Sequence, residues 1–140
     1  VKMENKQVVI NGLNALVEMC HNKSYAAGWW VDLESGKNLR DEVRNSTRLG
    51  KALVAEKLCL IHSETSEAME GHRKSSKDDK LPQYSMFATE LADVLIRLAD
   101  LIGATGENDF AQIVIDKLEY NSNREDHKIE NRMKEGGKAY

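Results

Sequence analysis

The chain has 140 residues, of which 41% are hydrophobic and 31% charged, and its formal net charge is −3. This composition fits one globular domain over residues 1–140 and gives no electrostatic reason to expect a nucleic-acid or membrane partner. No apolar run reaches the roughly 18 residues that a membrane span needs, so none is expected.

Apolar residues recur at helical spacing in four segments, the first of which includes Val9, Leu13 and Val17. Proline occurs once and no useful strand-like alternation is found, which also favours helices. In chain order we expect a helix over about 4–23, an irregular stretch over 24–46, a helix over about 47–73, a polar loop over 74–85, a helix over about 84–102, a helix from about 109 to 124 and a polar tail over 125–140. The sequence therefore predicts an all-α, four-helix-bundle-like domain with a helical core over about 4–124.

Two helix boundaries carry more specific predictions. Gly103 and Gly106 are expected to end the third helix, because glycine is the usual residue just past a helix C-terminus. Asp109 is expected to cap the fourth helix, with Gln112 three residues later as in a capping box.

The cysteines and the N-terminal segment bear on the cellular compartment. Cys20 and Cys59 lie within apolar helical patterns and are expected to be buried, reduced thiols, which fits a reducing cytoplasm. The N-terminal residues lack the charged-then-apolar order of a signal peptide, so a cytoplasmic location is expected. His21 belongs to a lone Glu-x-x-His and is expected to be structural or exposed.

Two of the predicted helices each carry two carboxylates three residues apart, Glu64 with Glu67 and Glu90 with Asp93. Residues at this spacing share a helix face, so four carboxylates converge if the two helices pack side by side. Converging like charges need a counter-charge, and a hard divalent cation such as Mg²⁺ prefers oxygen ligands. The alternative is a solvated surface with scattered acids. Glu67 and Glu70 form a further pair at the same spacing, so either of them can be a bystander.

The fourth predicted helix carries Lys117, Asn121 and Arg124 along one face. A cation, an amide and a guanidinium in line can bind phosphate oxygens, and arginine can do so with two parallel hydrogen bonds. The alternative is an exposed basic helix end that complements the helix dipole. Arg97, one turn after Asp93, either orients that carboxylate or forms a surface ion pair.

Taken in order, these residues resemble the MazG-like, all-α nucleoside triphosphate pyrophosphohydrolases. The similarity spans about residues 47–128, and it departs from many members at Glu125, where they have proline. The family's Glu-x-x-Glu and Glu-x-x-Asp motifs and its later Lys-x-x-x-Asn-x-x-Arg pattern fall on Glu64, Glu67, Glu90, Asp93, Lys117, Asn121 and Arg124.

The resemblance implies Mg²⁺-dependent hydrolysis of a nucleoside triphosphate between its α- and β-phosphates, which yields a nucleoside monophosphate and pyrophosphate. The four carboxylates would hold Mg²⁺, with Mn²⁺ as a substitute, and either Glu64 or Glu67 would accept the proton of the attacking water. Lys117, Asn121 and Arg124 would hold the β- and γ-phosphates. The resemblance also implies a homo-oligomer, either a dimer or a tetramer.

Three aromatic residues, Trp29, Trp30 and Tyr120, are candidates for the base or sugar pocket. For Trp30, packing against the helices is an equal alternative. The main rival for the whole chain is a non-catalytic helical interaction module with a solvated acidic face. A di-iron carboxylate bundle is disfavoured, because it needs the Glu-x-x-His motif twice.

Overall fold

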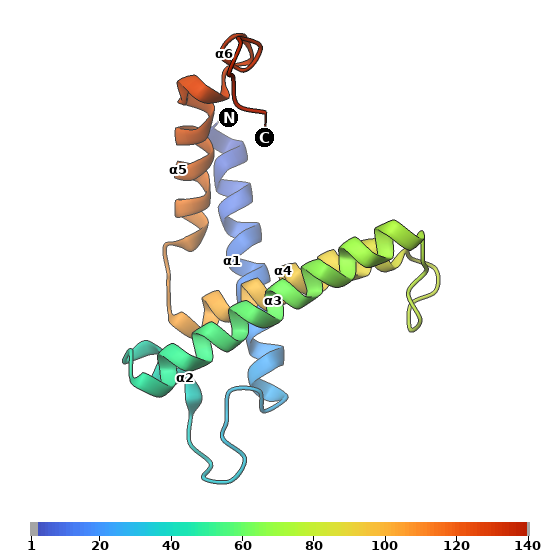
Figure 1. The fold of residues 1–140 in the computed structure, drawn as a ribbon. Helices are drawn as coiled ribbons and strands as arrows, with labels where there is room; N and C mark the ends of the chain where they lie inside the picture. The colour runs from blue at the N-terminus through green and yellow to red at the C-terminus, as the bar shows by residue number, and fades with distance from the viewer. Residues whose placement is uncertain (1–2, 140) are drawn as a thin grey trace. The chain divides into compact units, whose positions relative to one another are not determined.

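The computed structural model describes residues 3–139, and helices account for most of this range (Figure 1). Within it there is no β-strand, only isolated bridges between Val31 and Asn38 and between Lys77 and Ser85. The all-α prediction is therefore confirmed. The helices are α1 (Met3–Ala26), α2 (Leu39–Arg44), α3 (Arg48–Lys74), α4 (Met86–Thr105), α5 (Phe110–Asn123), the 3₁₀ turn η1 (Glu125–His127) and α6 (Ile129–Arg132). Among the described residues, none of these helices is both long and apolar enough to cross a membrane.

The chain divides into two units, each described by itself. One unit is Ala15–Glu107, and the other combines Val1–Asn14 with Asn108–Tyr140. Helix α1 contributes residues to both units. We call Ala15–Glu107 the hairpin unit, because its main feature is the pair of long helices α3 and α4.

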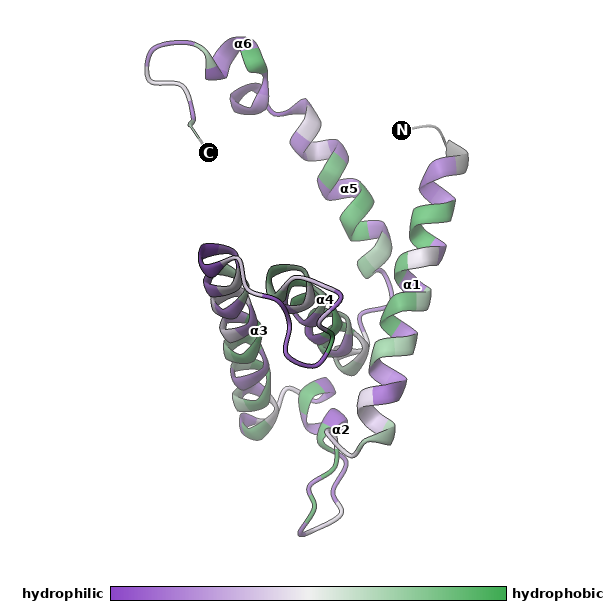
Figure 2. Ribbon diagram, turned by 90° about the vertical axis from the view of Figure 1, so that its right-hand side faces the viewer, coloured by the Kyte–Doolittle hydropathy of each residue, from purple (hydrophilic) through white to green (hydrophobic). Residues whose placement is uncertain are grey.

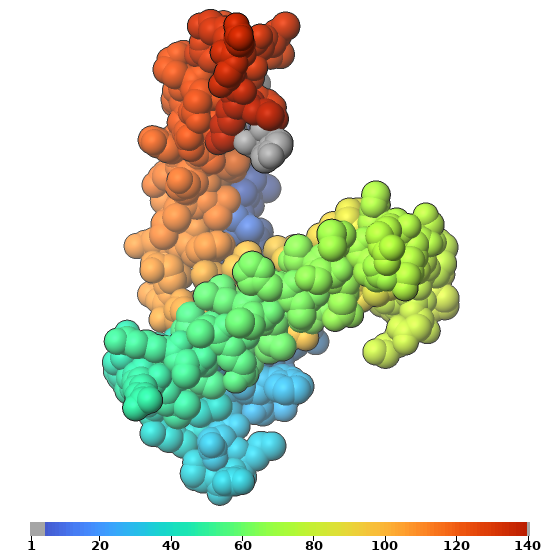
Figure 3. All heavy atoms as spheres, in the orientation of Figure 1, coloured from blue at the N-terminus to red at the C-terminus, as the bar shows by residue number. Residues whose placement is uncertain are grey.

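Helices α3 and α4 lie side by side and run in opposite directions, joined by the loop over residues 75–85 (Figure 1). In Figure 3 the atoms of α3 cover much of α4. The helices approach closely at the loop end, where a Cβ atom added to Gly71 would lie 2.8 Å from Cγ of Met86. Glycine therefore permits this close packing.

Side-chain caps and glycine set the ends of these two helices. Thr47 accepts a hydrogen bond from the backbone N–H of Gly50 at the start of α3, and Ser85 accepts one from Ala88 at the start of α4. Gly106, with φ of 76°, ends α4 as predicted. The prediction was wrong for Gly103, which lies inside α4 and faces α1. A Cβ atom there would lie 2.5 Å from Cβ of His21.

The apolar core of the hairpin unit forms around residues from the stretch expected to be irregular and from α4. Trp30 is fully buried, and it clusters with Val43, Leu101 and Ala104. Val43 belongs to α2, a six-residue helix within the stretch 24–46 that the sequence pattern did not predict. Its N-cap is Asn38, whose side chain accepts a hydrogen bond from the backbone N–H of Arg40.

Beside this core, the buried carboxylate of Asp100 accepts three hydrogen bonds, each 2.8 Å long. The donors are His21 Nδ1, Trp30 Nε1 and Ser24 Oγ. The Arg40 guanidinium, which has only donors, lies 3.4 Å from His21 Nε2. His21 Nε2 is therefore the acceptor, and the N–H group at Nδ1 donates the hydrogen bond to Asp100. This network joins α1, the following loop, α2 and α4, and it makes His21 structural, one of the two roles expected.

The two cysteines differ in environment. Cys20 is buried, and burial, together with the charge of Asp100, raises the pKa of its thiol. Cys59 is exposed, so the prediction that both thiols are buried was wrong for this residue.

In the second unit, Lys6 of α1 forms an ion pair with Glu119 of α5. Asp109 is the N-cap of α5 but makes no side-chain capping hydrogen bond, and Gln112 instead donates to Asp116 over 2.8 Å. The predicted capping box is therefore wrong, since its reciprocal partner is engaged one turn further along. The segment around η1 and α6 is mainly hydrophilic, as expected for the tail (Figure 2).

Candidate metal centre

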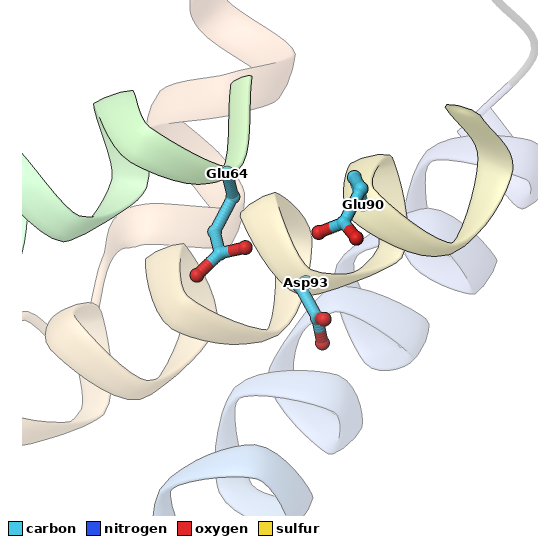
Figure 4. A group of neighbouring side chains, drawn as sticks. All are labelled: Glu64, Glu90 and Asp93. Atoms are coloured by element: carbon cyan, nitrogen blue, oxygen red, sulfur yellow. The ribbon is translucent and has the colours of Figure 1, made fainter. Parts of the chain in front are cut away.

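Three of the four predicted carboxylates come together between α3 and α4. Glu64 projects from α3, and Glu90 and Asp93 project from successive turns of α4 (Figure 4). Each contributes an oxygen to a group in which all the oxygens lie within 4.8 Å of one another. The group is graded in depth, because Glu64 is buried, Glu90 half-buried and Asp93 exposed. Such a group can hold a cation that enters from the exposed side.

Glu67, the fourth predicted ligand, lies outside this group of oxygens. It is one turn of α3 beyond Glu64, and it lines the same cavity as Glu90 and Asp93. Its negative charge is close enough to act on the Glu90 carboxyl. The structure therefore places Glu67 beside the centre.

The carboxyl group of Glu90 carries the strongest electrostatic signature of the site. Its pKa is raised from 4.5 to about 7, mainly because burial disfavours the charged form. Hydrogen bonding to Glu64 raises it further, and the charges of Glu67, Glu64 and Asp93 act in the same direction. Near neutral pH, a cation-free centre thus retains a proton on Glu90 for much of the time, in place of a positive counter-charge.

Arg97 forms an ion pair, which is one of the two roles expected, and its partner is Glu64 of α3. Its Nη2 atom lies 2.7 Å from Oε1 of Glu64, across the α3–α4 interface. Arg97 therefore neutralises the most buried acid of the group and does not orient Asp93. Arg97 thus balances one charge of the centre, and among the described residues neither Glu90 nor Asp93 forms an ion pair.

Glu70 has a different environment from Glu67, although the sequence could not tell the two apart. Glu70 pairs with Lys74 over 2.6 Å and with Arg73 over 2.7 Å. Hydrogen bonding to Lys74 and Arg73 lowers the pKa of this carboxyl. It is thus a surface ion-pair residue, and it lies outside the carboxylate group.

A cavity of about 580 Å³ adjoins the carboxylates and is formed entirely within the hairpin unit. Glu67, Glu90 and Asp93 line one part of it, and residues of the α3–α4 loop line another, among them Lys77 and Lys80. The sequence predicts only that this loop is polar. Its lysines could have been noticed, because they lie between the two acidic motifs in the chain.

The predicted phosphate-binding residues lie in the other unit, on α5 and at its C-terminal end. Arg124 caps the helix and forms two hydrogen bonds to Asp126, of 2.9 and 2.6 Å. Lys117 lies with its Nζ atom 5.2 Å from the ring centroid of Tyr120. Asn121 is half-buried one turn beyond Lys117. A phosphate that bound Arg124 through both Nε and Nη2 would have to displace Asp126.

The predicted aromatic pocket residues differ greatly in exposure. Trp30 is 0% exposed and its indole N–H is bonded to Asp100, so it has no ring face open to a nucleotide base. For this residue the packing alternative holds. Trp29 is 68% exposed and Tyr120 61%, so both present open rings.

The hairpin unit therefore offers clustered oxygen donors, an adjoining cavity and an acid with a raised pKa, which together suit a hard divalent cation and an anionic ligand bound through it. Neither a family model, nor a curated protein, nor a solved structure matches the chain.

Proposed function

We propose that the protein is a Mg²⁺-dependent nucleoside triphosphate pyrophosphohydrolase of the MazG-like, all-α type. It would cleave a ribo- or deoxyribonucleoside triphosphate between the α- and β-phosphates, giving the monophosphate and pyrophosphate. The observation that carries the proposal is the convergence of Glu64, Glu90 and Asp93 on the two helices that bear the predicted motifs. The resemblance in motif order supplies the reaction.

The donor set fits Mg²⁺. All candidate ligands are carboxylate oxygens, which a hard cation prefers over nitrogen or sulfur. The pKa of Glu90 is raised mainly by burial, and also by hydrogen bonding to Glu64 and by the neighbouring negative charges, and a bound cation would offset the cost of ionising it. Glu64, Glu90 and Asp93 would hold the ion. When bound, Mg²⁺ would neutralise charge on phosphate oxygens and lower the pKa of a water ligand.

Glu67 is the better placed of the two predicted general bases. Glu64 is buried and one of its oxygens is paired with Arg97, so it is less free than Glu67 to take up a proton. Glu67 lines the cavity and lies outside the carboxylate group, which leaves its carboxylate available to accept a proton from the attacking water. We therefore propose Glu67 as the base and Glu64 as a ligand positioned by Arg97.

The remaining predicted residues keep their proposed roles, except Trp30, which is fully buried. Lys117, Asn121 and Arg124 would bind the β- and γ-phosphates, and Arg124 would exchange its Asp126 partner for phosphate oxygens. Trp29 and Tyr120 are the candidates for the base or sugar pocket.

We also propose a cytoplasmic homo-oligomer, either a dimer or a tetramer. Its subunit contacts are supported by an apolar stripe along α4, where Phe87, Leu91 and Leu95 recur every four residues. They are 39%, 42% and 47% exposed, respectively. Contiguous exposed apolar side chains of this kind often mark subunit contacts. Light scattering coupled to size-exclusion chromatography tests this part, and a monomer at micromolar concentration would contradict it.

The alternative of a non-catalytic interaction module is less well supported. A module with a solvated acidic face would leave its carboxylates exposed and their pKa values near the usual range. Glu64 is instead only 7% exposed, and the pKa of Glu90 is raised to about 7. Both observations favour a functional site over a solvated acidic face.

A pyrophosphate-release screen over the common nucleoside triphosphates, with and without Mg²⁺, tests the proposal. We expect activity that needs Mg²⁺ and that is abolished by Glu67→Ala and by Asp93→Ala. Glu70→Ala is the matched control, since Glu70 lies on the same helix but pairs with Arg73 and Lys74. Helical circular dichroism should be unchanged in all variants. Activity retained in Asp93→Ala, or release without Mg²⁺, would contradict the proposal.

A further inference from the structure

The cavity beside the carboxylates also receives two lysines from the α3–α4 loop. Lys77 and Lys80 line it together with Glu90 and Asp93, and all four belong to the hairpin unit. The proposed phosphate-binding residues on α5 belong to the other unit. The structure therefore defines where Lys77 and Lys80 lie relative to Glu90 and Asp93.

The loop that carries these lysines is held in place by the carboxylate of Asp78. This carboxylate accepts hydrogen bonds from the backbone N–H groups of Lys80, over 3.0 Å, and Leu81, over 2.6 Å, and from Thr89 Oγ1 on α4, over 2.9 Å. Hydrogen bonding to Leu81 and to Thr89 lowers the pKa of Asp78, so it stays ionised. The backbone around Lys77 and Lys80 is thus fixed against α4.

Two further backbone hydrogen bonds close the loop. The N–H of Met86 donates to the carbonyl of Ser76 over 3.0 Å, and the N–H of Asp78 donates to the carbonyl of Tyr84 over 3.2 Å. A loop tied at both of its ends presents its side chains from a defined position. A flexible connection would not need these bonds.

The charges of the cavity point to the chemistry of its ligand. Among the side chains that the structure describes, neither Lys77 nor Lys80 has an ion-pair partner, whereas the nearby Lys74 pairs with Glu70. The cavity is also lined by five acids, so an anion without an accompanying cation would be repelled. They are Glu67, Asp78, Asp79, Glu90 and Asp93. A ligand that satisfies both sets of groups carries several negative charges together with a divalent cation. A metal-bound polyphosphate has this composition.

We infer that Lys77 and Lys80 bind the phosphate chain of the Mg²⁺-bound substrate in this cavity, an inference that rests on the proposed function. Each ammonium group offers three donors and a compact charge to phosphate oxygens. The two lysines are binding residues, since they hold the phosphate chain while the carboxylates hold the cation. Their removal should weaken substrate binding much more than it slows the chemical step.

The test compares the double variant K77Q/K80Q with the matched control K74Q, which removes a paired lysine from outside the cavity. Calorimetry with inorganic tripolyphosphate and Mg²⁺ should show an affinity about tenfold lower for the double variant, equivalent to about 1.4 kcal/mol. The KM for an accepted nucleotide should rise by a similar factor, with a smaller change in kcat. Binding of Mn²⁺ alone, followed by electron paramagnetic resonance, should be as in the wild type.

Equal tripolyphosphate affinity in K77Q/K80Q and K74Q would overturn the inference, even if the wild type hydrolyses nucleotides. Loss of Mn²⁺ binding in the double variant would also overturn it, because the lysines would then act through the metal centre or the fold. A wild type that releases no pyrophosphate would count against the proposed function alone. The tripolyphosphate titration would still decide the role of the lysines.

Discussion

Replacing Asp100 by alanine should strongly destabilise the hairpin unit. The substitution leaves two buried donors without an acceptor, His21 Nδ1 and Trp30 Nε1, each of which lies 2.8 Å from Asp100 in the native protein. A buried donor without a partner costs about 1–3 kcal/mol, so the free energy of unfolding should fall by about 2–6 kcal/mol. That is a large part of the roughly 5–15 kcal/mol typical of a whole domain.

Asp100→Asn separates the hydrogen-bonding argument from a simple loss of packing. Asparagine keeps one oxygen that can accept from both His21 and Trp30, and its amide group can donate to the Ser24 hydroxyl. We therefore expect it to cost only about 1 kcal/mol, for the loss of charge-assisted bonds. Urea unfolding, followed by circular dichroism and by tryptophan fluorescence, measures both changes. Asp79→Ala, in the exposed loop, is the control.

The reasoning is refuted if Asp100→Asn destabilises as much as Asp100→Ala, because shape and hydrogen bonding would then not matter. It is also refuted if Asp100→Ala lowers the free energy of unfolding by less than about 1 kcal/mol, since two buried donors without an acceptor should cost more than that.

Three further predictions follow from individual residues. Because the pKa of Glu90 is raised from 4.5 to about 7, the folded state holds more protons than the unfolded state, and the cation-free protein should lose stability as pH rises from about 4.5 through 7. Thermal unfolding across this range should show the slope in the wild type and not in Glu90→Gln. Gly103→Ala should destabilise by about 1–3 kcal/mol, measured by urea unfolding, because its Cβ would lie 2.5 Å from that of His21; an unchanged midpoint would contradict the close packing. A thiol reagent should label Cys59 at once and Cys20 only on unfolding, and equal rates would show that Cys20 is accessible.

The long helices could be predicted from sequence because their apolar spacing is regular. The predicted helix over 47–73 corresponds to Arg48–Lys74, and the predicted helix over 84–102 to Met86–Thr105. Helix α2 could not be predicted, since it is short and depends on the packing of Val43 and on the Asn38 cap. A helix of six residues is too short to show a repeated apolar spacing, and its stability comes from tertiary contacts.

The candidate site was predicted only as far as periodicity allows. Spacing places Glu64 and Glu67 on one face, but the depth of packing between two helices decides which acid reaches the partner helix. Glu64 joins the group of oxygens with Glu90 and Asp93 and pairs with Arg97, whereas Glu67 lies outside that group. The partner of Arg97 depends on the rotation of α3 against α4, which the sequence of one helix does not contain.

The role of Asp100 was missed because a single acid within a leucine-rich helix looks like a surface residue. Its neighbour Gly103, three residues later on the same face, was interpreted as a helix end. A glycine inside an apolar helix can instead mark a close approach, and here it admits His21 to the carboxylate. Asp100 and Gly103, three residues apart on α4, together indicate a buried polar contact with another helix.

The adjacent residues Trp29 and Trp30 give the protein two intrinsic fluorophores with different surroundings. Trp30 is sealed in the core against Asp100, so its emission should lie to the blue and resist soluble quenchers until the unit unfolds. Trp29 is 68% exposed, so its emission should lie to the red and should change when a ligand covers its ring. One emission spectrum can therefore follow ligand binding and unfolding as separate events, without a label.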